Sequence, residues 1–219
     1  MKTMTRQTAI PLALTAVVVA LIAGVLTVRA LTSPEPADAA ERADTTVRAD
    51  SHRLATAEDG KVTLVEFLDF ECEACAAAYP FVEQLREQYD GKVTFVLRYF
   101  PLPGHRNADD AAFAVESAAR QGKLEQMYQR MYDTQAEWGE SQDSKAALFR
   151  GYAEDLGLDM AQYDAEVASP EVAARVQKDV DDGTRLGVTG TPSFFLNGER
   201  LAPATTEEFV QAIDDALAQ

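Results

Sequence analysis

The chain has few cysteines and few histidines. Two of each occur among its 219 residues, so a framework of several disulfides is excluded. The cysteines alone would supply half of a tetrahedral zinc site, and only His52 and His105 remain as further nitrogen or sulfur ligands. We therefore expect no metal and no other cofactor.

Basic residues are also scarce. The chain carries 20 Lys and Arg against 36 Asp and Glu, a formal net charge of −16. This balance argues against nucleic acid and anionic lipid as partners, because both carry negative charge. We interpret the acidic composition as a solvated surface that keeps the protein soluble.

One long segment near the N-terminus lacks charge altogether. Residues 7–28 are dominated by Ala, Val, Leu and Ile and follow Lys2 and Arg6. Roughly 20 apolar residues are enough to span a bilayer as a helix, so we predict a single-pass membrane anchor with its N-terminus in the cytoplasm. A cleaved signal peptide is the alternative, because residues 37–39 have a small-x-small form. Both interpretations place the rest of the chain on the extracytoplasmic side of the cell membrane.

The remainder divides into a linker and one domain. Residues 29–58 are rich in Ala, Pro, Asp, Glu and Thr without a sustained apolar period, which predicts a flexible linker. Residues 59–219 are long enough for one domain of ordinary size. Their patterns predict a strand over 61–68, a helix over 76–89, a strand over 92–100, a helical block over 107–186, a hairpin over 193–201 and a final helix from 205.

The two cysteines form a C-x-x-C motif directly after the first predicted strand. Cys72 and Cys75 would lie about 5 Å apart between Cα atoms on a helix, within the range that a disulfide requires. So small a loop adds little stability, so the motif indicates redox chemistry. A helix N-terminus stabilises a thiolate. We expect Cys72 to be exposed and nucleophilic, and Cys75 to be buried and to resolve the mixed disulfide.

Four segments carry a resemblance to a known family. They are EFLDFECEAC at 66–75, YFPLPGH at 99–105, QGK at 121–123 and GTPSFFLNG at 190–198. In order and spacing they resemble the DsbA-like thiol–disulfide oxidoreductases of the thioredoxin superfamily. The resemblance implies an α/β thioredoxin fold with a central helical insertion.

The resemblance also implies roles for individual residues. Pro192 corresponds to a cis-proline beside the cysteines, and Thr191 before it offers its backbone to an extended peptide. Glu66 corresponds to a buried acid that exchanges a proton with Cys75, although an outward-facing strand residue is the alternative. His105 either flanks the substrate groove or makes a structural hydrogen bond in its loop.

The resulting functional hypothesis is disulfide exchange with exported proteins, coupled to a membrane redox partner. We expect a monomer and favour an oxidase slightly over a reductase or isomerase. Thr191 before the proline resembles the reductases and isomerases, so the direction stays open. An alternative of a different class is a non-catalytic, tethered peptide-binding module that keeps its cysteines as a static bond.

The residues between and around the cysteines predict an intermediate redox potential. Glu73 and Ala74 stand where the strong oxidant of the family has Pro-His, whose histidine stabilises the thiolate. Asp69 and Glu71 add further negative charge near Cys72, and like charge disfavours a second anion. A less stabilised thiolate makes the dithiol less oxidising. Equilibrium titration against glutathione measures the potential, and a value near about −120 mV would contradict the prediction.

Overall fold

The computed structural model describes residues 45–219. The predicted membrane anchor at 7–28 and the first part of the predicted linker lie outside the described residues. Within residues 45–219, every helix is too short or too polar to cross a bilayer.

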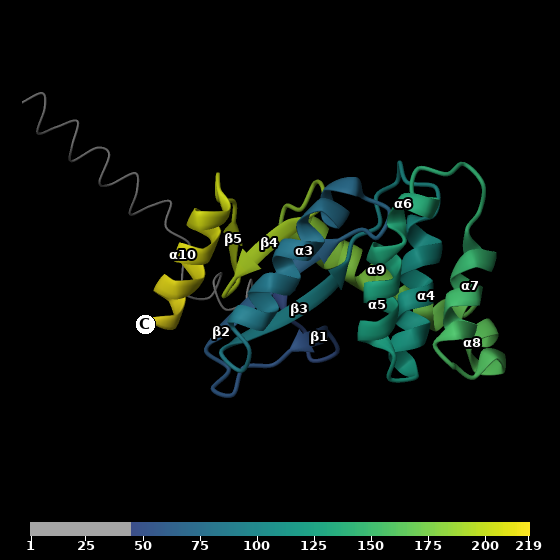
Figure 1. Cartoon of the computed structure of the whole chain (residues 1–219), viewed down its shortest axis with the longest axis horizontal. Helices are drawn as coiled ribbons and strands as arrows, with labels where there is room; N and C mark the ends of the chain where they lie inside the picture. The colour runs from purple at the N-terminus through teal and green to yellow at the C-terminus, as the bar shows by residue number, and fades with distance from the viewer. Residues whose placement is uncertain (1–44) are drawn as a thin grey trace, which may run out of the picture. The chain divides into compact units, whose positions relative to one another are not determined.

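The domain is built on a five-stranded mixed sheet with strand order β1-β3-β2-β4-β5 (Figure 1). The central strands β2 and β3 are parallel and pair from Val62↔Val93 to Leu68↔Tyr99, whereas the other pairs are antiparallel. Both central strands are almost entirely buried because helices cover both faces, which explains their continuous apolar sequences. The strands are β1 His52–Ala55, β2 Val62–Leu68, β3 Val93–Tyr99, β4 Ser193–Leu196 and β5 Glu199–Leu201.

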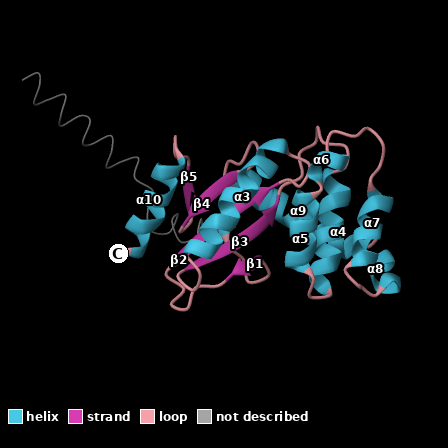
Figure 2. Cartoon of the chain, viewed as in Figure 1, coloured by secondary structure: helices cyan, strands magenta, loops and turns pink. Residues whose placement is uncertain are grey.

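Helices lie on both faces of this sheet and beyond one end of it (Figure 2). Helices α3 and α10 pack on one face, where Phe81 and Phe209 meet edge to face at 5.5 Å. Helix α9 packs on the other face against β3 and the loop that follows it. The helices are α3 Glu73–Gln88, α4 Ala108–Arg120, α5 Leu124–Asp133, α6 Gln135–Trp138, α7 Ala146–Asp155, α8 Met160–Val167, α9 Pro170–Arg185 and α10 Thr206–Leu217.

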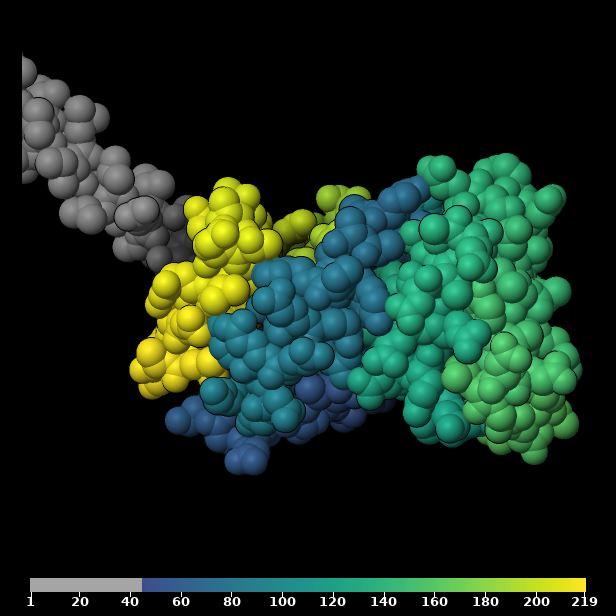
Figure 3. Space-filling model, viewed as in Figure 1, coloured from purple at the N-terminus to yellow at the C-terminus, as the bar shows by residue number. Residues whose placement is uncertain are grey.

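Helices α4 to α9 form one insertion between β3 and β4, so the predicted α/β fold with a central helical insertion is confirmed. Within the insertion, Ser169 caps α9, because its hydroxyl accepts a hydrogen bond from Val172 N at 3.1 Å. In the space-filling view the insertion, coloured teal to green, continues directly from the surface of α3 (Figure 3).

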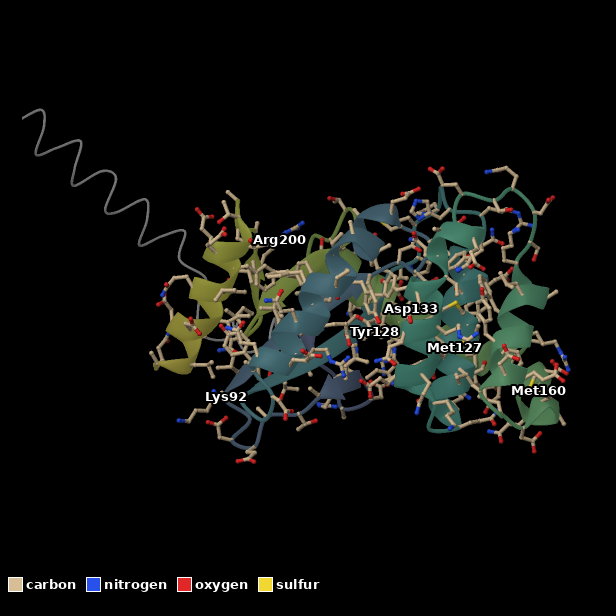
Figure 4. The ribbon with its side chains drawn as sticks, in the orientation of Figure 1. Lys92, Met127, Tyr128, Asp133, Met160 and Arg200 are labelled. Carbon is tan, nitrogen blue, oxygen red and sulfur yellow. The ribbon has the colours of Figure 1, made fainter. Side chains whose placement is uncertain are left out.

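The core of the insertion extends to the cysteines. One buried cluster joins Phe70, Cys72 and Cys75 to apolar side chains of α4, α5 and α7. Tyr128 of α5 lies between α5 and α3, where its ring meets that of Tyr79 at 5.5 Å (Figure 4). The insertion and the C-x-x-C segment therefore share one continuous core.

The predicted linker is corrected at its C-terminal end. Residues 52–55 form β1, which pairs with β3 through His52↔Leu97 and Arg53↔Val96. Four residues are too few to give an apolar period, and backbone pairing with a buried strand stabilises them instead. The domain therefore begins before residue 59.

A buried group of charges fixes the segment that precedes β1. Arg98 of β3 has no exposed surface and donates hydrogen bonds to Asp179 at 2.7 Å and Asp182 at 2.6 Å. It also donates to the carbonyls of Thr45 and Thr46, at 3.0 and 2.6 Å. Because a buried charge requires such partners, Arg98 holds residues 45–46 against α9 and β3.

Gly183 of α9 provides a test of packing between α9 and the sheet. A Cβ at this position would lie 2.8 Å from two ring carbons of Phe100 and 3.0 Å from Phe67. We predict that Gly183→Ala lowers the free energy of unfolding by roughly 1–3 kcal/mol, because the packed rings must move. Urea unfolding measures the change.

Gly151 of α7 is the matched control. Nothing lies within 4 Å of a Cβ placed there. Gly151→Ala should therefore stabilise the protein by roughly 0.5–1 kcal/mol, as expected for a helix interior. Equal stability of Gly183→Ala and the unmodified protein would contradict the packing argument.

Candidate active site

The C-x-x-C segment lies where β2 passes into α3. Cys72 is the N-cap of α3, with extended backbone angles of φ −71° and ψ 122°. Its N–H donates to the carbonyl of Asp69 at 3.2 Å, and its own carbonyl accepts from Ala76 N at 3.1 Å. The first N–H groups of a helix have no partner within the helix, so the Cys72 sulfur lies beside unpaired donors.

Both cysteines are free thiols, and they differ in burial. Cys75 has no exposed surface and Cys72 keeps 7%. The prediction that Cys72 is exposed is therefore wrong, because the segment before β4 covers it: Cys72 Sγ donates to the carbonyl of Thr191 at 3.4 Å. A reacting partner must approach through a small opening.

The surroundings of the two thiols have opposite effects on their acidity. Hydrogen bonding from the Cys75 side chain lowers the pKa of Cys72 to about 5, with further contributions from Thr191 and from the N–H groups of Cys75 and Ala74 that outweigh burial. Burial, the hydrogen bond to Cys72 and the charge of Glu66 raise the pKa of Cys75 far above its usual range. At neutral pH these shifts make Cys72 the thiolate, which no longer donates to the Thr191 carbonyl as the thiol does, and they keep Cys75 the thiol.

The acidic residues before Cys72 are held by hydrogen bonds. Asp69 is fully buried, and its carboxylate accepts from Glu71 N at 2.8 Å and Leu102 N at 2.9 Å. His105 Nδ1 lies 2.6 Å from the same carboxylate. Burial disfavours the charged imidazole, but the hydrogen bond and charge of Asp69 outweigh it and raise the pKa of His105. The structural hydrogen bond foreseen for His105 is thus present.

Glu66 faces the interior of the domain. It lies in β2 on the same face as Leu64, beneath α3, and keeps only 7% exposure, so the outward-facing alternative is wrong. Burial, with the charge of Glu83 as a second cause, raises the pKa of Glu66 to about 8. A cavity of about 10 Å³ beside it is otherwise lined by apolar side chains such as Leu54, Val82 and Phe194.

Thr191 and Pro192 lie against Cys72 although they are far from it in sequence. The peptide bond between them is cis, as the sequence resemblance implies. Beside Pro192 opens a groove of about 480 Å³, lined mainly by apolar side chains of α3, β4 and α10 such as Phe194 and Phe209. Arg200, labelled in Figure 4, borders this groove and donates to the carbonyl of Gly187 at 2.8 Å.

Glu73 and Ala74 are exposed in the first turn of α3. They lie one turn before Ala77 and Ala78, which line the groove. The cysteines, Glu66, Thr191, Pro192 and this dipeptide therefore come together around the N-terminus of α3. His105 joins them through Asp69. Among residues 45–219, no group of three or more His, Cys, Asp and Glu is arranged to hold a metal ion.

The family model for thioredoxin matches residues 50–215. The chain belongs to the thioredoxin family. Among solved structures, a thioredoxin-like oxidoreductase from Silicibacter pomeroyi is 27% identical, with a TM-score of 0.64 and coverage of 78% of this chain and 95% of that one. The resemblance to the DsbA-like thiol–disulfide oxidoreductases is confirmed.

More distant thioredoxin-family structures share the fold. BdbD of Bacillus subtilis is 18% identical, with a TM-score of 0.66 over 75% of this chain and 92% of that one. The catalytic domain of ScsC from Proteus mirabilis is 22% identical, with a TM-score of 0.65 over 82% and 97%.

Curated relatives match the thioredoxin-family domain within longer proteins. A Na⁺/H⁺ antiporter NhaA of Herminiimonas arsenicoxydans is 34% identical over 73% of this chain, and an NhaA 1 of Mycolicibacterium vanbaalenii is 36% identical over 65%. The chain spans only 24% and 22% of their lengths. The match therefore concerns one domain of those proteins.

Sequence reasoning missed one polar contact at this thioredoxin-family site. Gln135 of α6 is buried, and its side-chain amide donates to the carbonyls of Phe70 at 3.2 Å and Cys72 at 2.9 Å. A glutamine in the short segment Gln135–Trp138 gives no signal in sequence, because the contact depends on how the insertion packs.

The raised pKa of Glu66 predicts a pH-dependent stability. The folded protein keeps a proton on Glu66 up to about pH 8, whereas the ordinary value is 4.5. Between these values the folded state binds more protons than the unfolded state, so the free energy of unfolding falls as pH rises. The Glu66→Gln protein has no titrating group at this position, so its free energy of unfolding should not fall in this way. Toward pH 8 it should exceed that of the unmodified protein by several kcal/mol.

Urea unfolding across this pH range measures the difference between Glu66→Gln and the unmodified protein. Glu87→Gln, at an exposed position on α3, is the control and should show no comparable trend. A difference for Glu66→Gln that is constant with pH would contradict the assignment of a buried, protonated carboxyl.

Proposed function

We propose that this chain is an extracytoplasmic thiol–disulfide oxidoreductase that exchanges disulfides with exported proteins through Cys72 and Cys75. The observation that carries the proposal is the pair of unlike thiols at the start of α3, with the pKa of Cys72 lowered to about 5 beside the cis-proline segment. A thiolate is the nucleophile in this chemistry, and the lower-pKa sulfur is also the better leaving group.

As an oxidase the site would work from the Cys72–Cys75 disulfide. A substrate thiolate attacks Cys72 Sγ, which forms a mixed disulfide and releases Cys75 as a thiolate that takes up a proton. A second substrate thiolate then attacks the substrate sulfur of the mixed disulfide, and Cys72 leaves as a thiolate. The substrate gains a disulfide, and the enzyme retains the two electrons as a reduced pair. Reduction of a substrate runs these steps in reverse.

Glu66 is the proposed proton donor and acceptor for Cys75. Its charge is among the causes that raise the pKa of Cys75, so the two groups lie within electrostatic range. With a pKa of about 8, Glu66 holds a proton near neutral pH and gives it up without a large penalty.

The proposed substrate is an extended segment of an exported protein. The backbone of Thr191 pairs with it beside Pro192, as in other strand-addition modes of peptide recognition. The apolar groove beyond Pro192 suits side chains that an unfolded protein exposes. Glu73, Ala74 and His105 are proposed to flank the bound segment at the opening over Cys72.

The proposed setting is a membrane surface. An anchor at residues 7–28 would hold the domain outside the cytoplasm as a monomer, close to a membrane redox partner that restores the active form. The antiporter relatives support this setting, because there a domain of this kind is part of a longer protein named for a membrane transport activity.

We favour oxidation over reduction. The Cys72 pKa of about 5 means that its thiolate is stabilised in the reduced protein. A stabilised reduced form makes the dithiol pair oxidising. The value lies above the roughly 3.5 of the strongest oxidant of this kind, which supports an intermediate potential. A reductase or isomerase is the second candidate, and its support is Thr191 before the cis-proline.

Trapping on Cys72 tests the proposed function. In Cys75→Ser the mixed disulfide has no resolving thiol, so exported proteins should accumulate as adducts on Cys72 that dithiol reagents release. The double variant Cys72→Ser, Cys75→Ser is the control and should trap nothing. A folded Cys75→Ser protein without adducts would refute the nucleophile, and a Cys72–Cys75 bond inert to dithiol reagents would support the static, non-catalytic module.

A further inference from the structure

The helical insertion reaches the active-site loop through one buried amide. Gln135 lies in α6 with 6% of its surface exposed. Its Nε2 donates to the carbonyl of Phe70 at 3.2 Å and to that of Cys72 at 2.9 Å. These two carbonyls lie on either side of Glu71. The side chain of Gln135 therefore hydrogen-bonds to both ends of the turn Phe70–Cys72.

The N–H groups of the same turn are held from the opposite side. Asp69 accepts from Glu71 N through its side chain and from Cys72 N through its carbonyl. Among residues 45–219, no other side chain donates to the carbonyl of Phe70 or Cys72. Asp69 therefore holds the N–H groups of the turn, whereas its two carbonyls accept from Gln135, and that of Cys72 accepts also from the Ala76 N–H.

Aromatic packing joins the end of α5, just before Gln135, to the active-site segment. Tyr132, near the end of α5, lies 5.2 Å between ring centroids from Phe70 and is stacked on Tyr79 of α3 at 5.0 Å. The insertion is thus packed against residues on both sides of the C-x-x-C motif. Because these rings are largely buried and closely packed, we expect the end of α5 and the start of α6, which carries Gln135, to move little relative to the turn.

We propose that Gln135 is a positioning residue for thiol–disulfide exchange, one that holds the Phe70–Cys72 turn so that Cys72 Sγ stays beside Thr191 and the first N–H groups of α3. The inference rests on the proposed role of Cys72 as the nucleophile. Its physical basis is that the hydrogen bonds which stabilise the thiolate depend on the distance and angle between the sulfur and its donors. Loss of the Gln135 amide removes one hydrogen bond from each of two carbonyls and leaves the Cys72 carbonyl with the Ala76 N–H alone, so the turn relaxes and the sulfur moves away from its donors.

Two substitutions separate hydrogen bonding from shape. Gln135→Met keeps the length and bulk of the side chain but removes both donated hydrogen bonds. Gln135→Glu keeps the shape but replaces the donor with an oxygen that repels the two carbonyls. Gln121→Met is the matched control, because Gln121 also makes two hydrogen bonds within the insertion, with the N–H and the carbonyl of Asp159 at 2.8 and 3.2 Å.

The measurements are the thiolate titration of Cys72, the rate of reaction with oxidised glutathione and the equilibrium with the glutathione couple. Gln135→Met should raise the pKa of Cys72 by about one unit, speed the reaction about threefold because a more basic thiolate is more nucleophilic, and shift the equilibrium constant about tenfold toward the disulfide form, or about 30 mV more reducing. Gln135→Glu should change all three in the same direction by a larger factor. Gln121→Met should match the unmodified protein.

A folded Gln135→Met protein with unchanged titration, rate and equilibrium would overturn the proposal, even if its melting temperature fell. Failure of the proposed function has a different signature, because then the unmodified protein and Gln121→Met would also lack a reactive thiolate. Should Gln135→Met and Gln135→Glu both unfold, NMR of the unmodified protein decides. The side-chain amide signals of Gln135 must shift between oxidised and reduced forms more than those of Gln121, and equal shifts would overturn the proposal.

Discussion

The position of the Cys72 sulfur atom is the constraint on which the arrangement of the active site depends. Cys72 Sγ lies between the N-terminus of α3 and the carbonyl of Thr191, a residue that follows it by more than a hundred positions. That contact requires β2 and β4 to be neighbours in the sheet, which brings the end of one strand and the start of the other to the same edge. This strand pairing places the groove beside Pro192 and brings Thr191 over Cys72.

Burial acts on the neighbouring groups in different ways, according to their partners. Cys72 has hydrogen-bond donors and becomes acidic, whereas Cys75 and Glu66 lie deeper and hold their protons more firmly. Of the two sulfur atoms, the outer one is thus ionised, whereas the inner one and Glu66 beneath it hold their protons. Such a division suits exchange chemistry, because the entering sulfur must be ionised and the buried one must be neutralised when it is released.

The insertion is part of the site as well as of the fold. Its core is continuous with that of the C-x-x-C segment. Gln135 donates a hydrogen bond to the carbonyl of Cys72, and the ring of Tyr132 packs against that of Phe70, so both contact the turn that ends at Cys72. On the far side of the sheet, Arg98 joins β3 to α9 and to residues 45–46 through paired buried charges. The insertion therefore contacts the segment that follows β2, and the charged group around Arg98 holds β3 on the other face of the sheet.

Local sequence determined the elements and most of the site. The apolar runs of β2 and β3 and the pattern of the hairpin over 193–201 depend on a few neighbouring residues, so they predicted these elements correctly. The C-x-x-C motif and Pro192 were recognisable for the same reason. Strand β1 was missed, because a strand of four residues is stabilised by its partner rather than by its own pattern.

Only the tertiary structure decided the environment of each group. The sequence suggested that Cys72 is exposed and that nearby carboxylates oppose its ionisation. In the structure the Thr191 carbonyl covers Cys72, and hydrogen bonds donated to its sulfur, first from the Cys75 side chain, lower its pKa. The inward direction of Glu66 and the contact of Gln135 with Cys72 depend on packing between segments distant in the chain. Residue identity and local spacing thus determined which chemistry is available, and the long-range contacts decided the protonation and accessibility of each group.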